Sequence, residues 1–153
     1  MFPILKKWPF DALISHNRYT LLNRSADAMF DYAHNEGMTI LNAAPYAGGV
    51  LAKGSVDMPM LTYQPADEAM LAPVRAVEAV CARHGVAPGA VALQFSLQDK
   101  RIASTIVGVS DLGHINQTLN WTSTKIQQAL WDDLAELGYS TEDPEANRGY
   151  KPG

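Results

Sequence analysis

The chain alternates short segments of high β-strand propensity with longer segments of helical periodicity. Three strand segments are expected, at residues 11–15, 38–42 and 104–107, and a helical pattern follows each of them. This alternation is typical of parallel strands joined by right-handed crossovers, because each helix returns the chain to the same end of the sheet. The sequence therefore predicts an α/β fold with a parallel sheet.

The helical segments are bounded by residues that commonly begin helices. Asp111 and Thr124 stand where an N-cap side chain would accept a backbone hydrogen bond. Pro73 falls within the first two turns of the helix expected from Asp67, so a start nearer Leu71 is the alternative. The expected helices span residues 25–36, 67–84, 88–98, 111–121 and 124–137.

Two further segments show neither pattern. Proline and glycine punctuate residues 45–65, which we expect to form a long loop, and loops of that length are usually functional or mobile. Residues 139–153 are polar and contain two prolines. We therefore expect one domain over residues 1–138, followed by an extended polar tail.

Three strands are few for a parallel sheet, which is normally covered on both faces. If the helices cover one face only, as in a barrel, the other face and both sheet edges stay open. Either further strands come from elsewhere, or the helices rearrange to cover the sheet.

Composition excludes several classes of function. The net charge is −4 without a basic run, so nucleic acid is not expected as a partner. No apolar run approaches the ~18 residues of a membrane span, and the start of the chain lacks the order of a signal peptide. The single cysteine, Cys81, excludes an internal disulfide, fits a reducing cytoplasm, and is expected to be a small core residue.

The common motifs of catalysis are missing from the sequence. There is no G-x-G-x-x-G, P-loop, G-x-S-x-G or H-E-x-x-H motif. The four histidines share no metal-ligand spacing, so no metal site is expected. The acidic pairs are better explained as solvated helix surfaces than as acid–base pairs.

His16 directly follows the first expected strand. At the carboxyl end of a barrel strand, a side chain commonly belongs to the active site. The alternative is a partly solvated loop histidine, and the sequence favours neither. In the same loop, Arg18 is a candidate partner for a carboxylate, and Tyr19 a packing aromatic.

Two further loops follow strands. Residues 43–49 are small or turn-forming, which suits either a tight turn or a cradle for a ring or a diphosphate. Residues 107–111 lead from the last strand into a helix, whose free N–H groups favour an anion. Ser110 and His114 could face that anion, whereas Asp111 would occupy one N–H and add negative charge. An ordinary capped helix explains these residues equally well.

Taken together, these segments resemble the C-terminal part of an aldo-keto reductase. Four ordered motifs carry the resemblance, and they begin with Arg-Tyr-Thr-Leu-Leu-Asn-Arg and a loop ending Ala-Pro-Tyr-Ala-Gly-Gly-Val-Leu. The helix Val-Ala-Leu-Gln-Phe-Ser-Leu and a strand–helix unit starting Ser-Thr-Ile-Val-Gly-Val-Ser complete the set. The motifs occupy residues 18–24, 37–51, 91–97 and 104–119. Within the family, residues 61–72 and 93–96 are most similar to the branch of L-galactose, L-fucose and D-threo-aldose dehydrogenases.

The resemblance implies a fold and an activity. The fold would be part of a (β/α)8 TIM barrel, about its last three βα units, with a C-terminal helix and tail. The family binds NAD(P)(H) across the carboxyl ends of the strands and transfers hydride to or from a sugar or other carbonyl substrate. Its catalytic Asp, Tyr, Lys and His lie on the second to fourth strands. None of those four maps onto this chain, so no catalytic residue is expected.

The resemblance also implies cofactor-binding positions. His16 takes the place of a glutamine that touches the nicotinamide amide, and Ala43 takes the place of a stacking aromatic. The loop along the diphosphate and the loop near the adenosine phosphate map onto this chain, while Gln117 and Thr118 replace a Glu-Asn pair at the adenine. The implied positions are His16, Ala44, Pro45, Tyr46, Gly48, Leu51, Gly108, Val109, Ser110, His114, Gln117 and Thr118.

Three functions follow as hypotheses. The first is the cofactor-binding part of an NAD(P)-dependent oxidoreductase, inactive alone, with a slight preference for NAD because no Arg or Lys lies near Ser110 in the sequence. The second is a non-enzymatic half-barrel that pairs with a copy of itself or another chain, since burial of the open sheet needs a partner. The third is a nucleotide sensor without chemistry.

Overall fold

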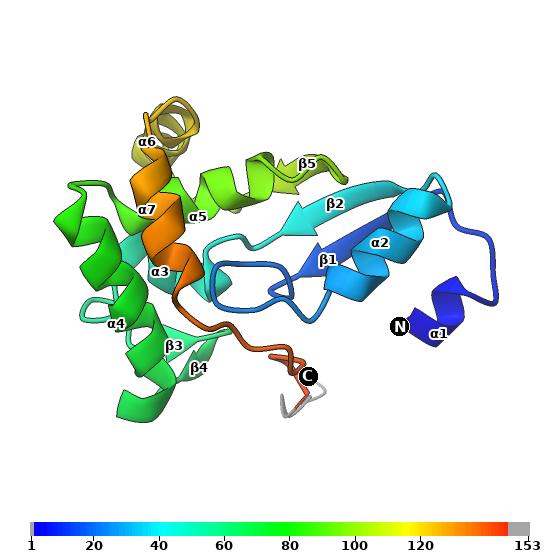
Figure 1. The fold of residues 1–153 in the computed structure, drawn as a ribbon, viewed down its shortest axis with the longest axis horizontal. Helices are drawn as coiled ribbons and strands as arrows, with labels where there is room; N and C mark the ends of the chain where they lie inside the picture. Colours follow the sequence, from blue (N-terminus) through cyan, green and yellow to red (C-terminus); the bar gives the residue numbers. More distant parts are fainter. Residues whose placement is uncertain (1, 147–153) are drawn as a thin grey trace.

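The computed structural model describes residues 2–146. Its central element is a three-stranded parallel sheet in the order β1-β2-β5, formed by β1 (Ala12–His16), β2 (Thr39–Ala43) and β5 (Ile102–Ile106) (Figure 1). A helix or a longer segment with helices separates each pair of strands. The three predicted strands and their parallel pairing are thus confirmed, with ends shifted by one or two residues.

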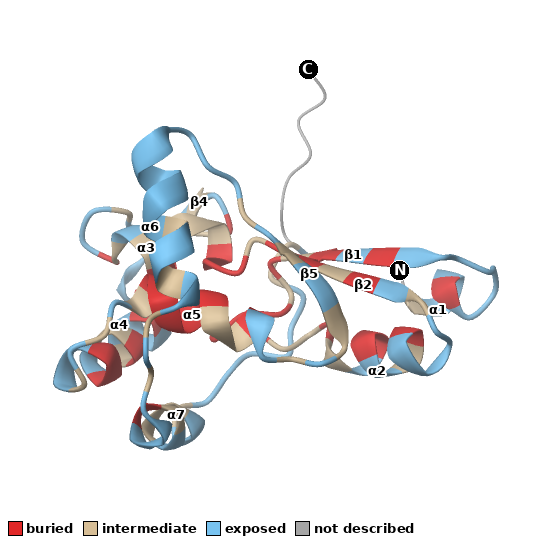
Figure 2. Ribbon diagram, turned by 90° about the horizontal axis from the view of Figure 1, so that it is seen from above, coloured by how far each residue is buried: buried red, intermediate tan, exposed pale blue. Residues whose placement is uncertain are grey.

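One face of the sheet is covered by helices. Phe30, from α2 (Asp27–Asn35), is fully buried in a core cluster with Leu13 and Ile40 of the strands. The short helix α1 (Phe2–Leu5) adds Leu5 to this cluster. Figure 2 shows α2 on one side of the strands only. This side is therefore the sheet's buried face.

The opposite face of the sheet is open. The register pairs Ile14 with Leu41 and Ala43 with Ile106, so these side chains share one face because strand residues alternate sides. Ile14 is 54% exposed and Ile106 42% exposed. The uncovered face and edges that the strand count predicts are present among the described residues.

A second core lies beyond the sheet, where four helices meet. It joins α3 (Val50–Lys53), α4 (Glu68–Arg83), α5 (Pro88–Leu97) and α7 (Gln128–Ala135). Cys81 is fully buried there, and burial raises the pKa of its thiol to about 11. The prediction that Cys81 is a core residue is confirmed.

The prediction of a long loop over residues 45–65 is wrong in most of its length. The segment folds into the 3-10 turn η1 (Ala47–Gly49), α3, and a small hairpin of β3 (Met60–Leu61) and β4 (Gln64–Pro65). Val50 and Leu51 are buried in the second core. Tertiary burial stabilises these short elements, which lack the length for a strong local pattern.

One predicted helix start is confirmed and another is wrong. α4 begins at Glu68 with Asp67 as its N-cap, as the range 67–84 predicts, and not nearer Leu71. Asp67 Oδ1 accepts from the Met70 N–H at 2.9 Å, and Pro73 is tolerated near the helix start. Thr124 does not cap the last helix, since its hydroxyl donates to the Asn120 carbonyl at 3.1 Å. It therefore belongs to the end of α6 (Leu112–Thr122), and α7 starts only at Gln128.

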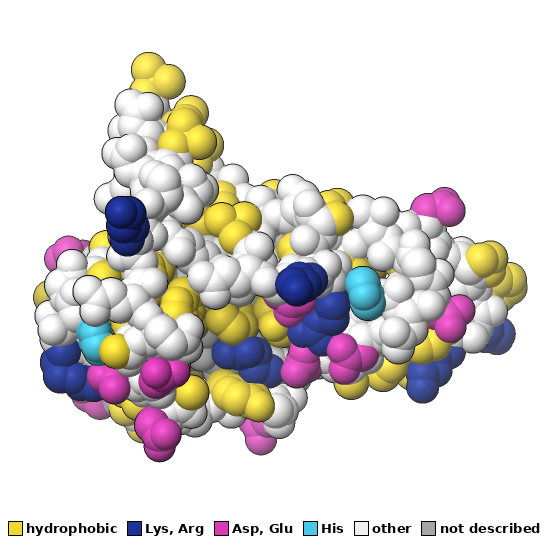
Figure 3. All heavy atoms as spheres, turned by 45° about the horizontal axis from the view of Figure 1, so that its top comes forward, with side chains coloured by type: hydrophobic (Ala, Val, Ile, Leu, Met, Phe, Trp, Pro, Cys, Tyr) yellow, Lys and Arg dark blue, Asp and Glu magenta, His cyan; other side chains and the backbone are white. Residues whose placement is uncertain are grey.

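α6 stands out from the rest of the structure. None of its residues is buried, and Leu112 is 78% exposed. Figure 3 shows hydrophobic side chains at the end of this projection. The predicted N-cap is confirmed, because Asp111 Oδ1 accepts from the His114 N–H at 3.0 Å.

Residues 139–146 of the predicted tail lie across the loop that follows β1. The Ser140 N–H donates to the Leu22 carbonyl at 2.9 Å, and the Arg24 N–H donates to the Ser140 carbonyl at 2.8 Å. Arg18 lies 2.8 Å from the Asp143 carboxylate, which confirms its predicted pairing with a carboxylate. We call this segment the C-terminal strap. Residues 147–153 of the predicted tail are outside the described residues.

None of the described helices combines the length and the apolar character that a membrane span requires.

A polar network joins the loop after β1 to the turn before β5. Tyr19 packs on Phe30 and Phe95, and its hydroxyl donates to Asp99 Oδ2 at 2.5 Å. Burial and the Asp99 carboxylate raise the pKa of Tyr19 to about 12. Burial opposes ionisation of Asp99, but donors on Arg101 and Tyr19 hold its pKa down at about 2. Both groups therefore titrate at different pH in the folded and unfolded chain.

We expect this network to set limits of stability at both ends of the pH scale. Asp99 ionises more easily in the folded chain than in the unfolded chain. Its contribution to the free energy of unfolding is therefore complete above its ordinary pKa of 3.8 and is lost as pH falls toward about 2. Tyr19 keeps its proton to a higher pH in the folded chain than in the unfolded chain. Its contribution to the free energy of unfolding is therefore complete below pH 10.0 and is lost as pH rises toward about 12. Each loss should reach about 2 kcal/mol of unfolding free energy.

Urea unfolding at a series of pH values measures these losses. Asp99→Asn should flatten the acid side of the profile relative to the parent chain, and Tyr19→Phe the alkaline side. Parent-like slopes in both variants would contradict the assignment of these limits to Tyr19 and Asp99.

Candidate functional site

The carboxyl ends of the three strands open into a trough made of two adjoining hollows. The inner hollow, about 350 Å³, lies at the ends of β1, β2 and β5, and the outer hollow, about 370 Å³, lies between α3 and α6. Both hollows are lined by Tyr46, Gly48, Gly49 and Gly108. The two hollows therefore adjoin at the loop that follows β2.

The structure brings together all but one of the implied cofactor positions. The inner hollow is lined by His16, Ala44, Pro45, Tyr46, Gly48 and Gly108. The outer hollow adds Val109, Ser110, His114, Gln117 and Thr118. Leu51 is the exception: its side chain is 1% exposed in the second core, and its N–H donates to the Tyr46 carbonyl at 3.2 Å.

The middle of the trough depends on tightly folded backbone. Ala44 and Gly48 have φ angles of 57° and 74°. A Cβ atom on Gly48 would lie 3.2 Å from the backbone of Thr62 in the hairpin. Glycine is thus needed here for both conformation and space. The hairpin can therefore pack closely against this turn, which lines both hollows.

Tyr46 lines both hollows of the trough. Its side chain is 9% exposed, and its hydroxyl is buried beside Thr118. Burial raises the pKa of this phenol, while Thr118 offsets part of the rise. Trp121 meets the Tyr46 ring edge-on, with ring centroids 5.7 Å apart. Tyr46 therefore forms part of the wall that the two hollows share.

The outer end of the trough holds a small charged cluster. Ser110 Oγ lies 3.0 Å from His114 Nδ1, and Asp111 Oδ2 lies 2.9 Å from the same nitrogen. The N–H of His114 lowers the pKa of Asp111. Ser110 and His114 therefore face one another as the sequence indicates, but a carboxylate already occupies the start of α6.

Lys53 is a trough residue that the sequence does not single out. It ends α3 and lines the outer hollow together with Ser110 and His114. The fold thus adds a basic side chain to the hollow that Ser110 lines, although no Arg or Lys is close to Ser110 in the sequence. Folding of residues 50–53 into a helix brings Lys53 there, and the expected loop did not predict that helix.

The inner end of the trough is built from three distant segments. His16 Nδ1 lies 3.0 Å from Glu145 Oε1 of the strap, and Tyr63 of the hairpin stacks on the His16 ring at 5.7 Å. Glu145 is partly buried, which opposes ionisation, but donors on Asn17 and His16 lower its pKa. Tyr63 and Glu145 carry no local sequence signal, because they meet His16 only through tertiary folding.

The described residues contain no cluster of three or more His, Cys, Asp or Glu that could hold a metal ion.

Comparison with known proteins agrees with this arrangement. Residues 2–138 match the Aldo/keto reductase family. An apo aldo-keto reductase structure from Bacillus halodurans superimposes with a TM-score of 0.69 at 16% identity, covering 96% of this chain and 50% of that one. At that identity the likeness concerns the fold alone.

Curated relatives have similar partial coverage. D-threo-aldose 1-dehydrogenase of Pseudomonas sp is 33% identical over 129 residues, which cover 82% of this chain and 39% of that protein. Pyridoxal 4-dehydrogenase of Microbacterium luteolum is 25% identical, covering 88% and 40%. L-galactose dehydrogenase of Arabidopsis thaliana is 25% identical, covering 71% and 33%.

These matches have two consequences. The chain spans at most about two fifths of the length of these curated relatives. The relatives include two of the dehydrogenase types that the sequence motifs resemble, and the family match covers the sheet, both cores and the trough. The chain therefore belongs to the aldo/keto reductase family.

Proposed function

We propose that this chain is the cofactor-binding part of an NAD(P)-dependent oxidoreductase. The observation that carries the proposal is the pair of adjoining hollows at the carboxyl ends of the strands. Their glycine-rich lining and the Lys53 side chain fit an extended, anionic dinucleotide. A bound nicotinamide supplies or accepts the hydride in such an enzyme.

Each part of the trough then has a role. His16 and Tyr63 lie at the nicotinamide end, where Tyr63 supplies an aromatic ring that Ala43 lacks. Ala44, Pro45, Tyr46 and the glycine-rich lining border the diphosphate. The adenosine end is bordered by Gly108, Val109, Ser110, His114, Gln117 and Thr118. Leu51 supports the loop from below.

Calorimetric titration of the chain with NADH tests the proposal. We expect saturable binding, and Lys53→Ala should weaken it roughly three- to tenfold because one charge-assisted contact to phosphate is lost. Lys100→Ala is the matched control, since Lys100 is exposed and lies outside the trough. No heat with either NADH or NADPH would remove the proposal.

We further propose a preference for NAD over NADP, caused by Asp111. Its carboxylate caps α6 and would repel a 2′-phosphate at Ser110 and His114. Asp111→Ser retains a capping oxygen without the charge. We expect this variant to improve NADPH affinity several-fold relative to NADH, measured by paired titrations. An unchanged ratio would contradict the role of Asp111.

The substrate is proposed to be a sugar or another carbonyl compound, as the names of the relatives suggest. The sequence carries none of the family's catalytic tetrad, so the chain would need the rest of a barrel for turnover. The open sheet face is the surface that such a remainder would cover.

The same open face supports a second candidate, a half-barrel that pairs with another copy. Ile14 and Ile106 expose apolar surface on the uncovered side of the sheet. Light scattering coupled to size exclusion distinguishes the candidates. A stable dimer of the parent chain that the Ile14→Lys substitution dissociates would support pairing. A folded monomer of the parent chain would count against it.

A further inference from the structure

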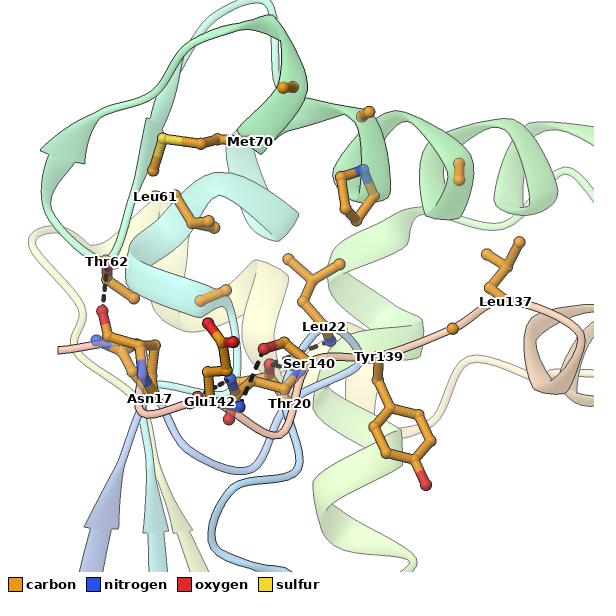
Figure 4. Close-up of a pocket in the computed structure, with 18 of the residues that line it drawn as sticks. Asn17, Thr20, Leu22, Leu61, Thr62, Met70, Leu137, Tyr139, Ser140 and Glu142 are labelled. Carbon is orange, nitrogen blue, oxygen red and sulfur yellow. Dashed lines mark hydrogen bonds between the residues drawn. The ribbon is translucent and has the colours of Figure 1, made fainter. Parts of the chain in front are cut away.

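A separate cavity lies on the other side of the hairpin, away from the trough. It has a volume of about 710 Å³ and is enclosed by α4, the hairpin, the loop after β1 and the C-terminal strap (Figure 4). We call it the strap cavity. No residue that lines it lines either hollow of the trough. An inference about the strap cavity therefore does not depend on nucleotide binding.

Most of the cavity wall is apolar. α4 contributes small side chains on its outer face, including Ala72 and Ala76, and the hairpin contributes Leu61. Figure 4 shows Leu61 and Leu22 on the walls between α4 and the strap. The volume is within the range of sites for small organic molecules. Such a wall suits a ligand with a compact apolar body.

The floor of the cavity contains an acceptor that lacks a donor. Asn17 lines the cavity, is 1% exposed, and donates through Nδ2 to Glu145 Oε1 at 3.0 Å. This bond fixes the orientation of the amide and leaves Oδ1 as its free end, without a hydrogen-bond partner. A buried carbonyl oxygen without a donor costs roughly 1–3 kcal/mol. A ligand that donates a hydrogen bond would remove that cost.

The charge of the lining also selects the ligand. Glu142 and Asp143 line the strap cavity, and no Lys, Arg or His does. Asp143 is paired with Arg18, whereas the Glu142 carboxylate has no basic partner among the described residues. An anion would be repelled here, and a cation would find a counter-charge.

We propose that the strap cavity binds an organic ammonium, a primary amine carried on a compact apolar body. The apolar body would pack against α4 and Leu61. The ammonium has three N–H donors and would donate hydrogen bonds to the Glu142 carboxylate and the Asn17 carbonyl oxygen. Asn17 and Glu142 both line this cavity, so we place the ammonium on their side of it.

Nuclear magnetic resonance titration of the ¹⁵N-labelled full chain tests the proposal with three probes of one shape. Benzylamine is a cationic donor, benzyl alcohol a neutral donor, and benzoate an anion. We expect benzylamine to shift the side-chain amide of Asn17 and the backbone amides of Ala72 and Ala76. Benzyl alcohol should bind more weakly, and benzoate should leave these resonances unchanged.

Two variants localise the effect. Glu142→Gln should weaken benzylamine binding about two- to fivefold, as expected for one partly exposed ion pair. Ala72→Phe should abolish binding by filling the cavity from the exposed face of α4, and amide dispersion reports whether the variant remains folded. Glu36→Gln is the control, because Glu36 is exposed at the end of α2. Benzoate binding as tight as benzylamine, or equal benzylamine affinities in the parent and both cavity variants, would overturn the proposal.

Discussion

The purified 153-residue chain is expected to bind NADH without transferring its hydride to an aldose. The motif resemblance implies that the family's proton donor and its partners map to no residue of this sequence, and a positioned proton donor alone contributes about 10²–10⁴-fold to the rate. His16 and Tyr63 lie at the inner end of the trough, but their rings stack on each other, and His16 also contacts Glu145 of the strap. We therefore expect no turnover above the uncatalysed rate.

Absorbance of the nicotinamide in the presence of an aldose measures this directly. A D-threo-aldose 1-dehydrogenase assayed in parallel is the positive control. Measurable turnover by the purified chain, abolished by Tyr63→Phe, would contradict the prediction and would place a proton donor in the hairpin.

Gly89→Ala is expected to damage both the second core and the trough. A Cβ atom on Gly89 would lie 2.3 Å from the Trp121 ring, which must therefore move. The backbone cannot follow easily, because Gln94 donates to the Trp121 carbonyl at 2.8 Å. Overpacking of this kind costs about 1–3 kcal/mol. Since Trp121 lines the outer hollow and contacts Tyr46, NADH affinity should also fall about tenfold, equivalent to roughly 1.4 kcal/mol.

Urea unfolding and calorimetry report the two effects separately. Gly138→Ala is the matched control, because a Cβ atom there meets nothing within 4 Å. Gly89→Ala with unchanged stability and unchanged NADH affinity would show that Trp121 does not connect α5 to the trough.

The parallel sheet could be predicted from the sequence because short, continuous segments of the chain show the strand and helix patterns that define it. Each strand is an apolar run followed by a helical pattern, and parallel pairing follows from that order. Side chains that directly follow strands must gather at one edge of the sheet. This is why His16, Pro45 and Gly108, far apart in the sequence, line one hollow.

The remaining features depend on contacts that no local pattern records. The hairpin strands have two residues each and are too short to show alternation. Glu145 reaches His16 across 129 residues, and the strap pairs with Asn23 through a single bridge. Lys53 enters the trough because tertiary burial of Val50 and Leu51 folds a four-residue helix. Such contacts are decided by packing, so the sequence alone could not predict them.

We propose that one nicotinamide dinucleotide occupies both hollows of the trough. An amide resonance map of the ¹⁵N-labelled chain titrated with NADH tests this. We expect shifts at both ends, at Ala44 in the inner hollow and at Ser110 and His114 in the outer hollow, with Ala72 and Ala76 of the strap cavity unaffected. Absence of shifts, or shifts confined to residues outside the trough, would contradict the proposal.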